Sequence, residues 1–291
     1  MAAAALVLAV LAISWGSILV RLCDAPPLTI AFLRVGIASL LLAAPALAMR
    51  SRRAPAERRW GAAAAGAGLL LALHFATWIA SLSFTSIAAS TLLVSTQPVF
   101  SLLLSRRLLG ETAGGRAIMA MLVALGGVAL IVWGDLRAGE DRLFGDLLAL
   151  AGAVTAAGYL IVGRRVRERV ALPTYLGVVN LWAAIGAGGL ALLFTQPLLP
   201  AARVDLAWCF LMALVPHLLG HGTLNWAVRR LRAYLVNLTV LGEPVLASLY
   251  AFLVFAEAPP LLVYPGALLI GAGVALAFSE TSARGKPRDG L

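Results

Sequence analysis

The residues best suited to chemistry in this sequence are a few ionisable side chains that stand inside long apolar runs. Glu243 lies 11 residues beyond Arg232 within one such run, which is roughly 16 Å along a helix at 1.5 Å per residue. An ionisable group at that depth in an apolar medium is costly and is a candidate for function, so this carboxyl could load a proton or contact a substrate ammonium. The alternative is a structural role beside Pro244, whose ring frees a backbone carbonyl of the preceding turn.

Arg34 is a second such residue, seven positions after Pro27 in another apolar run. Its guanidinium could attract a substrate carboxylate. It could equally extend toward water or pair with Glu243 or a backbone carbonyl. Of these roles, structural pairing is favoured.

The histidines form polar stripes along two runs. His74 has Trp78 one turn further on, so the two side chains share a helical face, while His217, His221 and Asn225 follow one another at four-residue spacing. A cavity lined from both halves of the chain is favoured over hydrogen bonding between packed helices. A metal site needs three or four ligands, and only two histidines share a spacing, so no metal is expected.

Hydroxyl and aromatic side chains complete the candidate site. Ser95 and Thr96 precede Pro98, and a proline there would kink the helix and turn carbonyls toward a cavity. Trp15 and Tyr159 stand near the ends of two runs, where aromatic residues line a path or anchor a membrane interface. We predict a substrate site formed by Trp15, His74, Thr77, Trp78, Ser95, Thr96, Tyr159, His221, Asn225 and Glu243.

The elements that must position these side chains are membrane-spanning helices. Of the 291 residues, 62% are hydrophobic and 12% are charged, whereas about a quarter are charged in soluble domains and disordered chains are polar. A span takes roughly 20 apolar residues. Ten apolar runs between breaking residues are predicted to be spans, at about 2–20, 27–48, 60–82, 86–105, 115–133, 144–163, 174–194, 206–228, 233–255 and 261–279.

The net charge of +10 comes from basic clusters between these runs, which indicate topology rather than a nucleic-acid surface. Connections on one side hold 17 Arg and Lys residues, and the alternate connections hold four. The positive-inside rule therefore places both termini in the cytoplasm. Cys23 and Cys209 fall near the same membrane face, where they are expected to be small packing residues rather than a disulfide.

The two halves of the chain repeat with an offset of 146 residues, so that Pro98 matches Pro244 and Glu111 matches Glu257. Each half holds five spans, an odd number, so the second half must enter the membrane in the opposite sense. Inverted repeats place a substrate site at their interface. We predict an all-α integral membrane protein with ten transmembrane helices around a central cavity. The two inverted five-helix repeats are expected at 1–134 and 144–279, and a cytoplasmic tail at 280–291.

Two further features are predicted to be structural. Small residues allow helices to approach closely, so glycines in the fifth and tenth spans are expected to pack these spans together or to form a dimer contact. The glycines are Gly126, Gly127, Gly271 and Gly273. Glu111 and Glu257 are expected to stabilise the N-terminus of the span that follows each of them.

These residues in this order resemble the drug/metabolite transporter superfamily, specifically its ten-helix EamA-type exporters. The resemblance rests on Trp15-Gly16-Ser17, on Pro27 with Arg34, and on the proline and glutamate pairs of both halves. It covers nearly the whole chain and implies inverted repeats, a central cavity and export of small metabolites, which in bacterial members include amino acids. Asn180 stands where the repeat matches Arg34, so any role of that arginine is not shared by both halves.

We therefore expect a secondary active or facilitative transporter that exports small amphipathic metabolites, above all aromatic or neutral amino acids, across the bacterial inner membrane by alternating access. The alternative is an exporter of drugs or other metabolites. A membrane-embedded enzyme is disfavoured because metalloprotease, nucleophile-elbow and P-loop motifs are absent, and a channel because no ring of charge is evident. No cofactor or nucleic acid is expected. The expected partners are the substrate, the bilayer and a second copy at the glycine faces.

Overall fold

Helices make up all the regular structure that is described. The computed structural model describes residues 2–50, 60–109, 115–167, 170–227, 240 and 242–284, and every regular element within them is helical. The predicted all-α membrane fold is confirmed. The helices are α1 (Ala2–Leu22), α2 (Pro27–Arg50), α3 (Trp60–Ser81), α4 (Ile87–Val94), α5 (Gln97–Leu109), α6 (Gly115–Ala138), α7 (Glu140–Arg167), α8 (Leu172–Leu193), α9 (Arg203–Met212), η2 (Ala213–His221), α10 (Gly222–Ala227), α12 (Gly242–Phe255) and α13 (Val263–Arg284).

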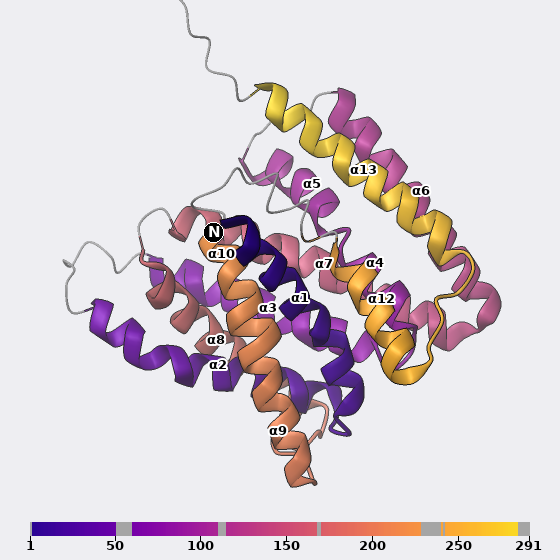
Figure 1. Ribbon diagram of the computed structural model, residues 1–291. Coiled ribbons are helices and arrows are strands. Elements are labelled where there is room, and N and C mark those ends of the chain that lie inside the picture. The colour runs from indigo at the N-terminus through magenta and orange to yellow at the C-terminus, as the bar shows by residue number, and fades with distance from the viewer. Residues whose placement is uncertain are drawn as a thin grey trace, which may run out of the picture.

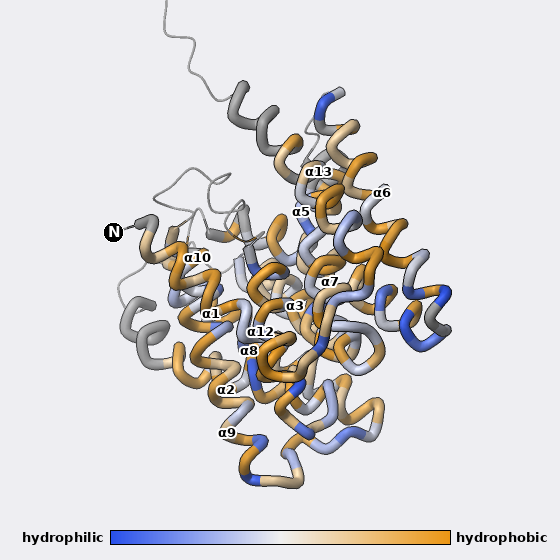
Figure 2. Tube along the Cα trace, turned by 45° about the vertical axis from the view of Figure 1, so that its right-hand side comes forward, coloured by the Kyte–Doolittle hydropathy of each residue, from blue (hydrophilic) through white to orange (hydrophobic). Residues whose placement is uncertain are grey.

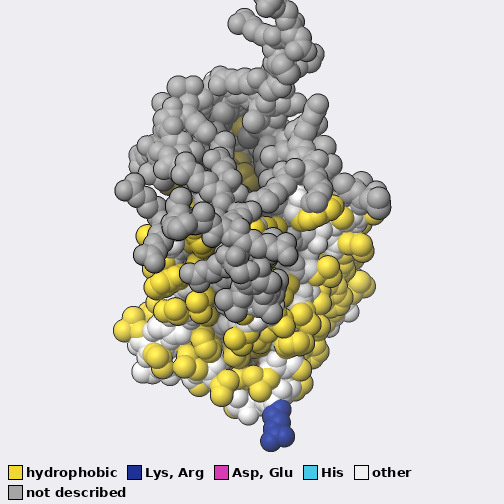
Figure 3. All heavy atoms as spheres, turned by 90° about the vertical axis from the view of Figure 1, so that its left-hand side faces the viewer, with side chains coloured by type: hydrophobic (Ala, Val, Ile, Leu, Met, Phe, Trp, Pro, Cys, Tyr) yellow, Lys and Arg dark blue, Asp and Glu magenta, His cyan; other side chains and the backbone are white. Residues whose placement is uncertain are grey.

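These helices correspond to the ten predicted spans. Six helical stretches have the length and hydropathy of a membrane crossing, and four shorter apolar helices fall in the remaining spans. Large apolar side chains point outward, and Leu40 and Leu261 are 76% and 82% exposed. Figure 2 shows hydrophobic residues along the helices and hydrophilic ones mainly at their connections, and hydrophobic side chains cover most of the described part of the face in Figure 3. Such a surface faces lipid rather than water.

Helices at equivalent places in the two repeats pack against each other. α2 lies against α8, α4 against α12, and α6 against α13; Figure 1 shows the last pair side by side along one edge of the molecule. α3 lies against α7, and the equivalent η2 lies against α1. The largest buried cluster forms where α1, α2, α3 and α8 meet, around Ile18, Ile30, Ile79 and Val179.

α6 and α13 touch at the level of the backbone because glycines stand at their contact. A Cβ on Gly127 would lie 2.6 Å from the carbonyl oxygen of Gly266, and a Cβ on Gly273 would lie 2.5 Å from a carbonyl oxygen of α6. The prediction that the fifth and tenth spans pack together is confirmed. Gly126 and Gly271, in contrast, have no atom within 4 Å of a Cβ position.

We expect Gly127→Val to destabilise the protein and Gly126→Val to leave it almost unchanged. The first substitution drives a side chain into the backbone of α13, and overpacking of this kind costs about 1–3 kcal/mol. The neighbouring glycine has open space instead. Thermal unfolding of both variants in detergent, followed by size-exclusion chromatography, measures the difference. Equal midpoints would show that the α6–α13 contact does not limit stability.

Prolines interrupt two of the predicted spans. The fourth span is divided into α4 and α5, with Pro98 at the second position of α5, as expected for a residue that lacks a backbone N–H. The eighth span consists of α9, η2 and α10, and η2 is a π-helix that contains Pro216. The π-helical stretch was not predicted, and it contains both His217 and His221. π-helical turns are frequent at functional sites.

Cys23 and Cys209 are both buried and free. Their Sγ atoms lie 3.9 Å apart, well beyond the disulfide bond length of about 2.05 Å. Next to them, the backbone N–H of Asp24 donates to Oδ1 of Asp205 at 3.0 Å. The two thiols thus help to join the end of α1 to the start of α9 as packing residues, in agreement with the prediction.

Candidate functional site

The guanidinium of Arg34 lies inside the bundle, on the second turn of α2, and the residue is only 1% exposed. Its Cζ atom is 4.3 Å from the centroid of the Phe75 ring and 5.5 Å from that of Trp78, both on α3. A desolvated cation over an aromatic ring is stabilised by about 2 kcal/mol. Gly16 on α1 lies beside this group, and a Cβ there would be in ordinary van der Waals contact with it, 3.4 Å from Trp78 and 3.8 Å from Nη1 of the arginine.

The prediction that Arg34 is paired structurally is wrong. Its Nε and Nη1 atoms are buried and donate to no partner, and among the described residues no ion pair joins it to Glu243. Glu243, in the first turn of α12, interacts with it electrostatically from a greater distance. Because a guanidinium is always charged and cannot accept hydrogen bonds, these two N–H groups are available to an anionic ligand.

His217 and Asn180 extend the group around the arginine. Nδ2 of Asn180 donates to the carbonyl oxygen of Leu176 at 2.9 Å, so its Oδ1 faces Nε2 of His217 at 2.7 Å and accepts from it. In the neutral ring the other nitrogen, Nδ1, then keeps a lone pair, which is buried without a partner. The His217 ring lies 5.4 Å from the Phe75 ring. We call Arg34, Phe75, Trp78, Asn180 and His217 the Arg34 cluster.

Four of the predicted site residues belong to or adjoin this cluster. Trp78 is a member, and the His74 ring stacks parallel to it with centroids 6.4 Å apart. Nδ1 of His74 also lies 2.9 Å from a carbonyl oxygen of α7, which holds the ring in place. The His221 ring lies 6.1 Å from that of His217, and Tyr159 packs against the same hydrophobic core.

Other predicted residues are positioned differently. Trp15 is 37% exposed and stacks on a tyrosine ring of α12 with centroids 4.8 Å apart. The hydroxyls of Thr77 and Thr96 donate to carbonyl oxygens of their own helices, and Ser95 ends α4. In the described ranges no hydrogen bond or ring contact links these four to the Arg34 cluster. The side chain of Asn225 lies outside the described residues.

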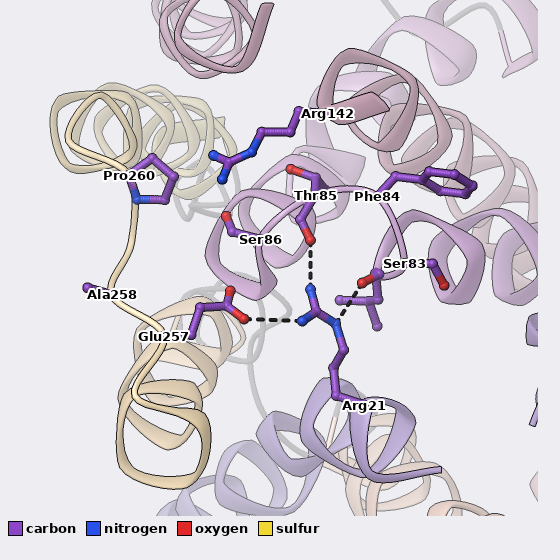
Figure 4. Close-up of a pocket in the computed structure, with 10 residues that line it drawn as sticks. Arg21, Ser83, Phe84, Thr85, Ser86, Arg142, Glu257, Ala258 and Pro260 are labelled. Atoms are coloured by element: carbon purple, nitrogen blue, oxygen red, sulfur yellow. Dashed lines mark hydrogen bonds and ion pairs between the residues drawn. The ribbon is translucent and has the colours of Figure 1, made fainter. Parts of the chain in front are cut away.

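At one end of the bundle, Arg21 in the last turn of α1 joins two connections, α3–α4 and α12–α13, as Figure 4 shows. Its Nε donates to the carbonyl oxygen of Leu82 at 2.6 Å, its Nη2 to that of Thr85 at 2.8 Å, and its Nη1 to Oε2 of Glu257 at 3.2 Å. Oε1 of the same glutamate accepts from the backbone N–H of Ile87, the first residue of α4, at 2.7 Å. We call these side chains and backbone groups the Arg21 network. It borders a cavity of about 460 Å³.

The predicted role of Glu257 is thereby corrected. Its carboxylate caps α4, which belongs to the other repeat, rather than α13, which follows it in the chain. The connection between α12 and α13 brings the carboxylate to that helix end, where a negative charge is stabilising. Glu111, its predicted counterpart, lies outside the described residues.

Sequence reasoning missed the contributions of Asn180, Arg21 and Asp146. Asn180 matches Arg34 through the repeat offset, and the structure brings these equivalent positions to one cluster. Asp146 lies only two positions inside the predicted span 144–163, so the depth argument that singled out Glu243 and Arg34 did not reach it. Arg21 offered no comparable signal. In the described part of the chain, no group of three or more His, Cys, Asp or Glu side chains is placed to hold a metal ion.

Comparison with known proteins gives a consistent picture. The model of the EamA-like transporter family matches residues 1–133 and 143–279. An uncharacterized protein of Pseudomonas aeruginosa is 29% identical over 284 residues, 96% of this chain and 94% of that protein. A probable terminal-alkyne amino-acid exporter of Streptantibioticus cattleyicolor is 30% identical over 204 residues, 67% of this chain and 65% of that protein. A protein of known crystal structure shares the fold, with a TM-score of 0.65 at 23% identity, over 96% of this chain and 97% of that one.

Proposed function

Because this chain belongs to the EamA-like transporter family, and is therefore a multi-pass membrane transporter, we propose that it exports small amphipathic metabolites, in particular neutral or aromatic amino acids. The relatives that carry functional names are transporters, which confirms the expectation that the chain is not an enzyme. The relative from Streptantibioticus cattleyicolor is named a probable amino-acid exporter, which supports this substrate class.

The observation that carries the proposal is the buried guanidinium of Arg34 with two unpartnered donors. Charge-assisted hydrogen bonds to a carboxylate are about twice as strong as neutral ones. A buried guanidinium with two unsatisfied N–H donors is costly unless a ligand uses them. The α-carboxylate of an amino acid is the simplest ligand of the right charge and size.

The rest of the Arg34 cluster suits the other parts of an amino acid. The lone pair on Nδ1 of His217 can accept from an ammonium group, and Glu243 adds a negative charge within electrostatic range of Arg34. The rings of Phe75 and Trp78 offer apolar and π surfaces to a side chain. Together they favour a zwitterion with an apolar or aromatic side chain over a sugar phosphate, which would need more cations.

Alternating access gives the Arg21 network a role. We assign its end of the bundle to the periplasmic side of the bacterial inner membrane and both termini to the cytoplasm, because the connections at the opposite end carry most of the arginines. The network then closes the periplasmic side while substrate enters from the cytoplasm. A homodimer would have to use the open faces of Gly126 and Gly271, since Gly127 and Gly273 already contact the partner helix in the same chain.

Uptake into proteoliposomes tests the substrate class. We expect saturable uptake of radiolabelled neutral or aromatic amino acids, measured with and without a pH gradient, and competition by unlabelled amino acids of the same class. Protein-free liposomes are the control. If no amino acid is taken up while a drug or another metabolite is, the amino-acid assignment is wrong and the alternative substrate class applies.

A further inference from the structure

Two carboxyl groups are buried together beside the Arg21 network. Asp135, in the last turn of α6, is 1% exposed, and Asp146, in the second turn of α7, is 0% exposed. Both lie beside Thr85 in the connection between α3 and α4. α7 approaches this connection so closely that a Cβ on Gly145 would lie 2.8 Å from the Thr85 nitrogen. The two acids are therefore held in a tightly packed place.

The two carboxyl groups differ in their partners. Thr85 Oγ1 donates to Oδ2 of Asp135 at 2.9 Å, and Nη1 of Arg142 donates to Oδ1 at 3.4 Å. Both oxygens of Asp146 are buried and make no hydrogen bond of normal geometry, while Thr85, Asp135 and Arg142 all lie close enough to act on the carboxyl group. Asp146 thus has unused acceptors and interacts with a second carboxyl group, that of Asp135.

The charges around the pair leave one negative charge unbalanced. The charged groups on neighbouring elements are Arg21, Glu257, Arg137 and Arg142. The first two neutralise each other in an ion pair, and the third is exposed and lies over an aromatic ring. Arg142 pairs with Asp135. Among the described residues no cation forms an ion pair with Asp146, and Arg142 is the one guanidinium shared by both acids.

We propose that Asp135 and Asp146 form a binding site for one exchangeable proton, and that this proton couples to the transport cycle. The inference rests on the proposed transport function. A carboxylate cut off from water and from partners needs a positive charge to remain buried. A proton on one carboxylate oxygen, shared with the other group, supplies that charge and breaks no other bond. A cavity of about 220 Å³ lined by Asp135 and Arg142 gives it a route to the pair.

Thr85 links this site to the closed end of the transporter. Its hydroxyl bonds to Asp135, while its carbonyl oxygen accepts from Arg21. Release of the proton leaves two carboxylates beside one guanidinium, that of Arg142. The repulsion between the carboxylates then acts on Thr85, whose carbonyl oxygen accepts from Arg21. Proton binding therefore favours the closed Arg21 network, and proton release favours its opening.

The first test measures how much a pH gradient stimulates transport in proteoliposomes. For Asp146→Asn, we expect the ratio of uptake with and without the gradient to fall to about 1, because the site no longer exchanges a proton. Asp141→Asn, on the exposed first turn of the same helix, should keep the wild-type ratio. Asp135→Asn is a second variant of the site and should behave like Asp146→Asn. A wild-type ratio in both site variants would overturn the proposal, as would loss of the gradient effect in Glu243→Gln alone.

The second test needs no substrate, so it separates the proton site from the proposed function. If the folded protein holds this proton more tightly than the unfolded chain does, stability falls as the pH rises. We expect the unfolding midpoint of the wild type and of Asp141→Asn to fall more steeply between about pH 5 and about pH 8 than that of Asp146→Asn. Identical slopes would refute the site. If the unfolding midpoint changes with the sodium concentration at constant pH, the site binds a metal cation instead of a proton and the proposal is wrong.

Discussion

Replacing Arg34 with Gln is expected to reduce amino-acid transport by about 100-fold or more. The substitution removes the charged donors from a site that water does not reach, where each charge-assisted hydrogen bond contributes about 1.5–3 kcal/mol. About 3 kcal/mol corresponds to roughly a 100-fold weaker affinity. Arg34→Lys should be intermediate, since it retains the charge and loses the planar guanidinium. Initial rates at several substrate concentrations measure the effect.

Two comparisons make this result specific. Arg116→Gln removes the same charge from an exposed position in the first turn of α6 and should transport like the wild type. The amine formed by decarboxylation of the best substrate should compete equally well in the wild type and in Arg34→Gln, because it has no carboxylate for the guanidinium to bind. If Arg34→Gln folds as a monodisperse protein and transports amino acids normally, the guanidinium does not bind the carboxylate.

Replacing Arg21 with Ala is expected to open the closed end of the transporter. Arg21 makes three hydrogen bonds to two connections, and one of them is an ion pair between groups that are only partly exposed. Their loss should raise the population of the open state about tenfold, which corresponds to about 1.4 kcal/mol. Glu257→Gln should have a smaller effect, because it keeps an acceptor for the N-terminus of α4.

A single cysteine can report this opening. Ser17 is 1% exposed and lies next to Gly16, so Ser17→Cys in a variant without Cys23 and Cys209 should react slowly with a membrane-impermeant maleimide added outside spheroplasts. Arg21→Ala should accelerate labelling about tenfold. Arg203→Ala, which removes an exposed arginine from the same end, is the control. Unchanged labelling in Arg21→Ala would show that the network does not close the path.

The local features of the chain were predictable because each depends on neighbours in sequence. Apolar run length alone indicated the helices, and the spacing of Pro98 predicted the break before α5. The glycine spacing predicted the contact between α6 and α13. A glycine lets any neighbouring helix approach closely, whichever part of the chain that helix belongs to.

The composition of the Arg34 cluster was only partly predictable. Trp78, His74 and His221 were identified because ionisable and aromatic residues inside apolar runs are rare and costly. Thr77 and Thr96 shared that signal, yet neither is linked to the Arg34 cluster, since a polar side chain in a span can also bond within its own helix.

By itself, the sequence determined the spans, their repeat and the uneven distribution of arginines, because these follow from the composition of continuous segments. Only the tertiary structure decided which buried polar groups have partners. Arg34 was expected to be paired and is not, Glu257 caps a helix of the other repeat, and Asp146 faces a second carboxyl group. The physical reason is that a buried charge is balanced by whatever packing brings within a few ångströms, and those neighbours come from helices that are far apart in the chain.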